Sequence, residues 1–295
     1  MAYDLIIKNG RHFDGSGAPS VVRHLGIRGG KVAAVSEDPL DEAGCREVID
    51  ARGQWVMPGF LDTHTHYDAE LLASPGLKES VRHGVTTVTF GSCSIGMVCA
   101  EAEDCSDMFT RVESIPREHV LPLLRKTKTW NTPAGYVAHL ESMPLGPNAT
   151  AFLGHSDLRV SVMGLGRAVD RDVRPSEDEM RRMEQVLEEG LDAGLLGLST
   201  MTTKWDKLDG DRYRSASLPT TYARWGEYAR LNRILRRRGK IHQGAPNIVT
   251  KVNTLLFLGA SLGLFRKKLK TTLITLMDVK SDGIMHRVVG KLAHF

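Results

Sequence analysis

The stretch that most constrains the fold is QWVMPGFLDTHTHYD at 54–68, an apolar run that ends in two histidines separated by one residue. The apolar run predicts a strand, which Pro58-Gly59 interrupts. Because alternate side chains of a strand point the same way, His64 and His66 are expected to project together at its end. Two neutral imidazoles aimed at one point are half of a metal site. The alternative is two ordinary polar residues in a loop, and the flanking acid and Pro-Gly break favour the metal site.

Two different rhythms divide the chain into a domain of residues 1–57 and a domain of residues 58–295. The first contains short strands with turn signals at Asn9-Gly10 and Gly29-Gly30, which predicts an all-β module without a site of its own. In the second, strands, loops and helices alternate, which predicts parallel βα units and an α/β fold. The expected strands of this second domain are 59–64, 85–91, 149–154, 195–199, 240–244 and 271–277, and the expected helices are 71–83, 117–128, 176–193 and 221–238.

Composition and charge exclude several classes of protein. The 39 basic and 35 acidic residues are too balanced to indicate a nucleic-acid partner. The four cysteines have no CxxC pair and no disulfide framework, so we expect a reducing compartment and a cytoplasmic protein. The N-terminus does not have the pattern of a signal peptide, and no apolar run reaches the roughly 18 residues that a membrane span needs. We therefore expect no membrane association.

Three further residues fall at the ends of expected strands, where parallel α/β proteins place their ligands. Cys93 follows the second strand, His155 the third, and His242 lies in the fifth. Thiolate and imidazole are both good zinc ligands. Cys93 could instead be a small buried apolar residue, and His242 a structural histidine. We interpret His155 as lining a pocket or as a structural hydrogen bonder.

Several of these motifs resemble the amidohydrolase superfamily, whose first barrel strand commonly reads PGFxDxHxH. The runs GVTTVTFGSCSIG at 84–96, NATAFLGHSDLR at 148–159 and EEGLDAGLLGLST at 188–200 resemble its D-aminoacylase (N-acyl-D-amino-acid deacylase) branch. The resemblance extends to about Asn247. It implies a TIM-like (β/α) barrel with a small N-terminal β-sandwich domain, and zinc-dependent hydrolysis of the amide bond of N-acyl amino acids, which are small-molecule substrates.

The resemblance also implies roles for single residues, with one or two divalent ions. Cys93 would take the bridging position that a carbamylated lysine occupies in other amidohydrolases, and no lysine ends the fourth strand here. Cys93, His242 and a ligand on the sixth strand would hold one zinc ion. His64 and His66 would offer a second, weaker site.

The chain departs from the family pattern in two places. The sixth strand lacks the family's histidine, and Asp278 is either an oxygen ligand in its place or a polar strand-end residue. The catalytic aspartate of the family follows an eighth strand, whereas we count six candidate strands, so the catalytic residue is unassigned and we expect an incomplete barrel, truncated at its C-terminus. Three alternatives follow: a non-catalytic fragment, a split enzyme that needs a complementary C-terminal chain or self-association, and a hydantoinase-like hydrolase of cyclic amides.

Overall fold

A computed structural model of the chain describes residues 2–247, 252–263, 267–274, 287 and 291. The chain divides into two compact units, Met1–Phe60 and Leu61–Phe295. No helix in the described ranges is both long and apolar enough to cross a membrane. All four cysteines fall within those ranges and are free thiols.

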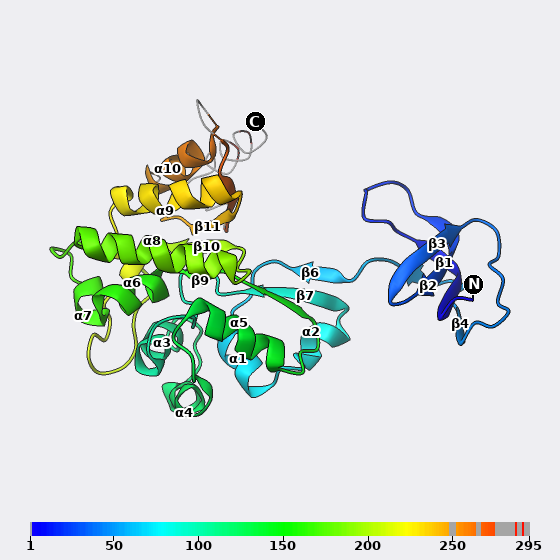
Figure 1. The fold of residues 1–295 in the computed structure, drawn as a ribbon, viewed down its shortest axis with the longest axis horizontal. Helices are drawn as coiled ribbons and strands as arrows, with labels where there is room; N and C mark the ends of the chain where they lie inside the picture. Colours follow the sequence, from blue (N-terminus) through cyan, green and yellow to red (C-terminus); the bar gives the residue numbers. More distant parts are fainter. Residues whose placement is uncertain (1, 248–251, 264–266, 275–286, 288–290, 292–295) are drawn as a thin grey trace. The chain divides into compact units, whose positions relative to one another are not determined.

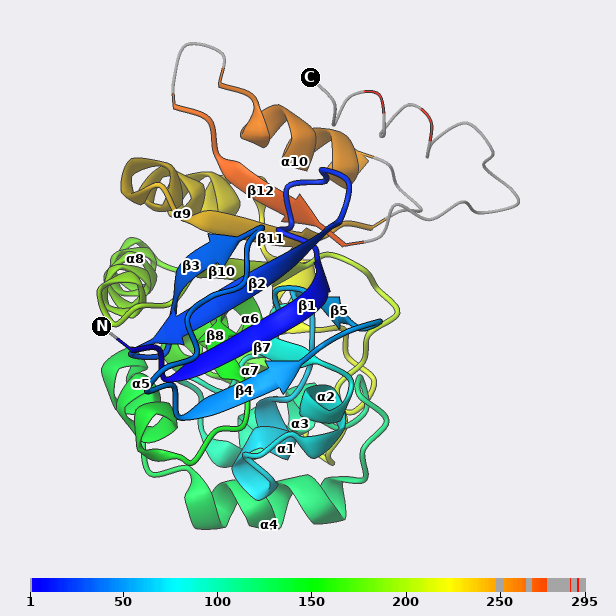
Figure 2. The same ribbon diagram turned by 90° about the vertical axis from the view of Figure 1, so that its right-hand side faces the viewer.

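The first unit is built on one five-stranded sheet of order β3-β2-β1-β4, with β5 also paired to β1 (Figure 2). A second sheet, as a β-sandwich requires, is not formed by the described residues of this unit. The hairpin at Gly29-Gly30 is confirmed, because both glycines have the positive φ of a tight turn between β2 and β3. The strands are β1 (Leu5–His12), β2 (Val21–Arg28), β3 (Lys31–Ser36), β4 (Glu47–Asp50) and β5 (Trp55–Val56).

The turn predicted at Asn9-Gly10 is wrong. Strand β1 continues through both residues, and its pairing register with β2 shifts between Ile7 and Gly10. Asn9 has a φ of 62°, a conformation that asparagine tolerates, and it forms a bulge in the strand instead of a hairpin.

The second unit contains two short sheets of sequential strands, one of order β6-β7-β8 and one of order β12-β11-β10-β9 (Figure 1). The pairs β7–β8, β9–β10, β10–β11 and β11–β12 are all parallel, as the βα alternation predicts. Only Phe152 separates β8 from β9, and its N–H donates to the carbonyl of Phe90. The strands are β6 (Phe60–Asp62), β7 (Val85–Phe90), β8 (Asn148–Ala151), β9 (Leu153–Gly154), β10 (Gly197–Met201), β11 (Ile241–Ala245) and β12 (Lys270–Leu273).

Helices connect these strands and cover them with a common apolar core. Helix α8 begins at a capping box in which Ser176 and Glu179 bond each other's backbone N–H, so the predicted helix at 176–193 is confirmed. The predicted helix at 71–83 is instead two helices, because Pro75 and Gly76 interrupt it. The helices are α1 (Asp68–Ala73), α2 (Lys78–Arg82), α3 (Ala102–Phe109), α4 (Arg117–Thr127), α5 (Pro133–Ser142), α6 (His155–Met163), α7 (Leu165–Ala168), α8 (Glu177–Asp192), α9 (Trp225–Arg238) and α10 (Val252–Ser261), with a 3-10 turn at Pro219–Tyr222.

Candidate metal centre

The first two histidines of the site stand just after strand β6. Thr65, between them, is buried, and both its backbone N–H and its hydroxyl donate to the carbonyl of Thr89, at 2.8 and 2.9 Å. This double bond ties the His-Thr-His segment to strand β7. Because Thr65 is turned toward the sheet, His64 and His66 face the other way together, and their ring centroids are 5.2 Å apart.

Cys93 is carried on a turn with a strained backbone after strand β7. Cys93 and Ser94 have φ values of 52° and 72°, in the left-handed region that side chains with a Cβ rarely adopt. Side chains from two neighbouring strands hold this turn. The Cys93 N–H donates to the Gln243 side chain at 3.1 Å, and the Ser94 N–H donates to the Ser199 hydroxyl at 3.0 Å. Strain of this kind persists where the surroundings impose it, and it is common at functional sites.

A buried carboxylate holds the segment that follows this turn. Asp157, on α6, accepts hydrogen bonds from the backbone N–H groups of Val98, Cys99 and Ala100, at 2.9, 2.9 and 2.7 Å. Burial raises its pKa to about 6, while these three donors act in the opposite direction. The loop after β7 is therefore fixed at two points, near Cys93 and at residues 98–100.

His64, His66 and Cys93 converge on one point. The Cys93 Sγ lies 3.4 Å from His64 Nε2, and one ligand atom from each of the three residues lies within 4.8 Å of the others. In a tetrahedral zinc site, bonds of about 2.3 Å to sulfur and 2.05 Å to nitrogen place those two ligand atoms about 3.5 Å apart. The spacing and the donor types therefore fit a single zinc ion with three protein ligands and an open position.

Burial governs the protonation of these three groups. It lowers the pKa of His64, and it lowers the pKa of His66 to about 4, with His64 adding to the effect. Both imidazoles are therefore neutral at pH 7, the form that binds a metal. Burial raises the pKa of the Cys93 thiol well above its ordinary value, and the nearby carboxylates of Glu113, Asp206 and Asp68 raise it further. Without a cation, Cys93 is therefore a protonated thiol.

Two carboxyl groups beside this cluster were not predicted from the sequence. Asp68 is fully buried, accepts a hydrogen bond from the Gly91 N–H at 3.2 Å, and has a pKa raised to about 7 by burial. Glu113 has an Oε1 atom 3.4 Å from His66 Nδ1, and burial raises its pKa to about 7 as well. Asp68 could have been found in the sequence, since it lies two residues after His66. Glu113 belongs to no motif, and no sequence signal indicated it.

The structure does not bring His242 together with Cys93, which corrects its predicted place in the metal site. Side chains alternate along β11, and Gln243 is the one that reaches the Cys93 turn. His242 is buried on the other face, where its Nε2 lies 3.0 Å from the Thr200 hydroxyl and its ring packs against Phe257. Its pKa is lowered to about 3 by burial, with a smaller contribution from a neighbouring histidine. Asp278, the other predicted ligand, lies outside the described residues.

His155 is part of a buried ionic cluster, in agreement with the structural alternative. It is the first residue of α6, and its Nε2 lies 2.8 Å from Glu227 Oε1 on α9. Arg159 pairs with the other oxygen of the same carboxylate. These hydrogen bonds and charges hold the pKa of Glu227 below its usual value, against the effect of burial. The cluster joins two helices and lines no pocket described in the structure.

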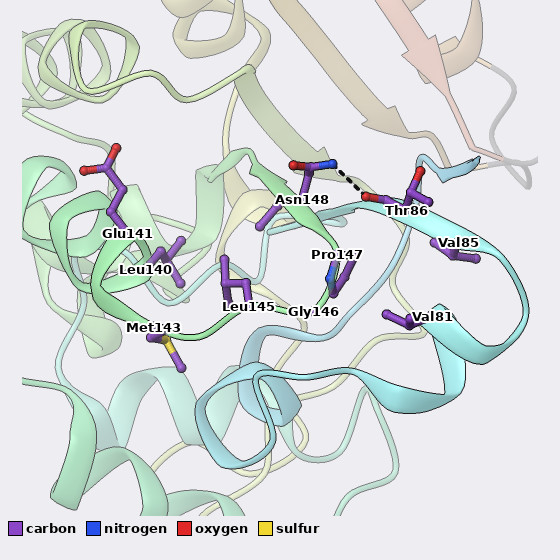
Figure 3. A pocket seen from close by; sticks show the side chains of 11 residues that line it. Val81, Val85, Thr86, Leu140, Glu141, Met143, Leu145, Gly146, Pro147 and Asn148 are labelled. Carbon is purple, nitrogen blue, oxygen red and sulfur yellow. Dashed lines mark hydrogen bonds between the residues drawn. The ribbon is translucent and has the colours of Figure 1, made fainter. Parts of the chain in front are cut away.

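A pocket of about 480 Å³ lies at the opposite ends of the strands from Cys93 (Figure 3). It is bounded by the first residues of β7 and β8, where the Asn148 side chain donates to the Thr86 carbonyl at 2.9 Å. Parallel α/β proteins place their chemistry at the carboxyl ends of the strands, so this pocket is not the candidate active site.

Comparison with known proteins gives a consistent family. The profile described as "Amidohydrolase family" matches residues 47–217. An uncharacterized protein of Mycobacterium tuberculosis is 52% identical over 292 residues, which are 98% of this chain and 48% of that protein. N-acyl-D-glutamate deacylase of Alcaligenes xylosoxydans xylosoxydans is 32% identical over 239 residues, 81% of this chain and 43% of that enzyme.

Two solved structures have a similar fold. A crystal structure of D-aminoacylase has a TM-score of 0.76 at 22% identity, and the match covers 99% of this chain and 56% of the other. N-acyl-D-glutamate deacylase of Bordetella bronchiseptica, complexed with zinc and a phosphonate inhibitor, has a TM-score of 0.77 at 22% identity, with 100% and 56% coverage. The chain thus spans about half the length of the curated relatives it matches.

Proposed function

Because this chain belongs to the amidohydrolase superfamily, in which it resembles the D-aminoacylase branch, we propose that it carries the metal centre of a hydrolase of N-acyl-D-amino acids. The observation that carries the proposal is the convergence of His64, His66 and Cys93 within 4.8 Å. We propose zinc as the ion, since one thiol and two imidazoles are donors that zinc prefers. We also propose that the parallel strands belong to a TIM-like (β/α) barrel.

The residues of the chain have separate tasks in this proposal. Such an ion, when bound, supplies the positive charge that polarises an amide carbonyl and favours ionisation of an attacking water. Ser199 and Gln243 hold the Cys93 turn in its strained conformation, so the sulfur is placed before any ion arrives. Thr65 does the same for the two histidines. No general base is assigned among the described residues.

The test is hydrolysis of N-acetyl-D-glutamate by the purified chain with added zinc, followed by release of the free amine. N-acetyl-L-glutamate tests stereochemical preference, and dihydrouracil tests a cyclic amide. Turnover that Cys93→Ala abolishes supports the proposal. Turnover that persists in Cys93→Ala would exclude this site as the catalytic centre.

A second candidate function is favoured by one observation, the twofold greater length of the curated relatives. In it, the chain acts as the metal-binding part of an enzyme that another polypeptide completes. The purified chain would then bind zinc and lack turnover by itself. Addition of a polypeptide that corresponds to the remaining half of a relative would restore hydrolysis.

A further inference from the structure

The imidazole of His66 has one nitrogen to bind an ion and a second whose partner is unassigned. Its Nδ1 atom is buried, and the described residues offer it no hydrogen bond of normal length. The charged group nearest to that atom is the Glu113 carboxylate, with Oε1 at 3.4 Å. Both side chains are about four-fifths buried, with 18% and 20% of their surface exposed. A buried polar atom without a partner is costly, so this pair calls for an explanation.

The backbone around Glu113 fixes where its side chain lies. Glu113 continues past the end of α3, and its N–H donates to the Phe109 carbonyl at 3.0 Å. The next residue, Ser114, has a φ of 57°, and the chain then closes with the Ile115 N–H donating to the Thr110 carbonyl at 2.9 Å. This closed turn brings a helix end, 47 residues away in sequence, beside the His-Thr-His segment.

We propose that Glu113 is the positioning residue of His66: its carboxylate accepts the Nδ1–H and so leaves Nε2 unprotonated and turned toward the ion. A neutral imidazole carries a single N–H, and the group that accepts this hydrogen selects the tautomer. Metal-binding histidines are commonly oriented in this way by a carboxylate, which also makes the other nitrogen a better donor. The pair needs to shorten by a few tenths of an ångström to form the bond, and such contacts often tighten when a site is loaded.

A role for Glu113 as a direct ligand is less consistent with the geometry. Within the described residues, the set of ligand atoms that lie within 4.8 Å of one another contains His64, His66 and Cys93, without Glu113. The other carboxylates near the cluster, Asp68 and Asp206, have partners of their own in Gly91 and Thr203. Glu113 is therefore the carboxylate placed to serve His66.

The inference rests on the proposed metal centre, and its first test needs no metal and no substrate. The tautomer of His66 in the metal-free protein is read from long-range ¹H–¹⁵N correlations at pH 8, above the Glu113 pKa of about 7. We expect the Nδ1–H tautomer in the wild type and a mixture in Glu113→Ala. Glu113→Gln keeps an acceptor of the same shape without the charge, and we expect an intermediate result. A predominant Nε2–H tautomer in the wild type would overturn the proposal.

The second test is zinc affinity by competition with a chelator. Loss of a carboxylate behind a ligand histidine weakens metal binding by about 10- to 100-fold, and we expect this from Glu113→Ala, with a smaller loss from Glu113→Gln. The control is Glu103→Gln, which removes the same charge from α3 at a surface pair with Arg125 and is expected to leave the affinity unchanged. An affinity within twofold of wild type in Glu113→Ala contradicts the proposal. A loss as large as that of His64→Ala also contradicts it, since it would make Glu113 a ligand.

The outcomes separate this inference from the proposed function. A chain that binds zinc with the expected tautomer and variants, but hydrolyses no N-acyl amino acid, refutes the proposed activity and leaves the role of Glu113 standing. Turnover together with the wrong tautomer does the opposite.

Discussion

Zinc binding should release one proton from Cys93, and this proton can be counted. Burial keeps the Cys93 thiol protonated from pH 6 to 9, whereas both imidazoles are already neutral, with the pKa of His66 at about 4. Because zinc binds the thiolate, one proton must leave the sulfur for each ion bound. That proton makes the apparent affinity rise tenfold per pH unit, or about 1.4 kcal/mol.

Two neighbouring carboxyl groups complicate the total count and not the difference. Asp68 and Glu113 have pKa values of about 7, so an adjacent cation also displaces protons from them near neutral pH. Above pH 8 both are largely ionised. The difference in protons released between the wild type and Cys93→Ala should therefore be one at pH 8.5.

The assay is titration calorimetry with zinc in buffers that differ in ionisation enthalpy, which yields the number of protons per ion. Cys99→Ala is the matched control, because Cys99 is also a buried thiol with a raised pKa but lies outside the ligand cluster. We expect its proton count to equal that of the wild type. If Cys93→Ala and the wild type release the same number of protons, Cys93 is not a ligand and the assignment of the site fails.

Three further predictions concern stability. Gly91→Ala should cost about 3 kcal/mol in urea unfolding, because a Cβ there would lie 2.3 Å from the Phe152 carbonyl oxygen at a φ of +69°; Gly194→Ala, with positive φ but open space, should cost about 1 kcal/mol, and equal losses would refute the steric argument. The folded-state pKa of Asp68, about 7, exceeds its unfolded value near 3.8, so its contribution to stability is complete below pH 4 and is lost as the pH rises to 7. Metal-free Asp68→Asn should therefore match the wild type at pH 4 and exceed it by up to about 4 kcal/mol at pH 8, and a gain independent of pH would contradict this. Glu227→Gln should lower the urea midpoint by about 3 kcal/mol of stability, because it leaves Arg159 buried without its counter-charge; a loss below 1 kcal/mol would show that the pair contributes little.

Much of the local structure could be predicted from the sequence because local chemistry decides it. The capping residues of α8 and the glycines between β2 and β3 act within a few positions, and both elements are as predicted. The convergence of His64, His66 and Cys93 was also predictable. It follows from the parallel arrangement of neighbouring strands, whose carboxyl ends meet.

The errors arose where both faces of an element are buried or where the chain returns from far away. In β11 four of the five residues are buried, so no alternation of polar and apolar residues shows which of His242 and Gln243 faces Cys93. A shift of one position exchanges the two faces. Glu113 reaches the site from the end of α3, and no spacing rule connects it to His66.

The bonds from residues 98–100 to Asp157 also provide a reporter for this region. Three consecutive amide hydrogens end on one buried carboxylate, so they should be shielded from deuterium exchange together and become labelled together when that segment opens. Their common exchange rate would measure how often the support beneath the cysteine gives way, in a molecule that still counts as folded by every global probe.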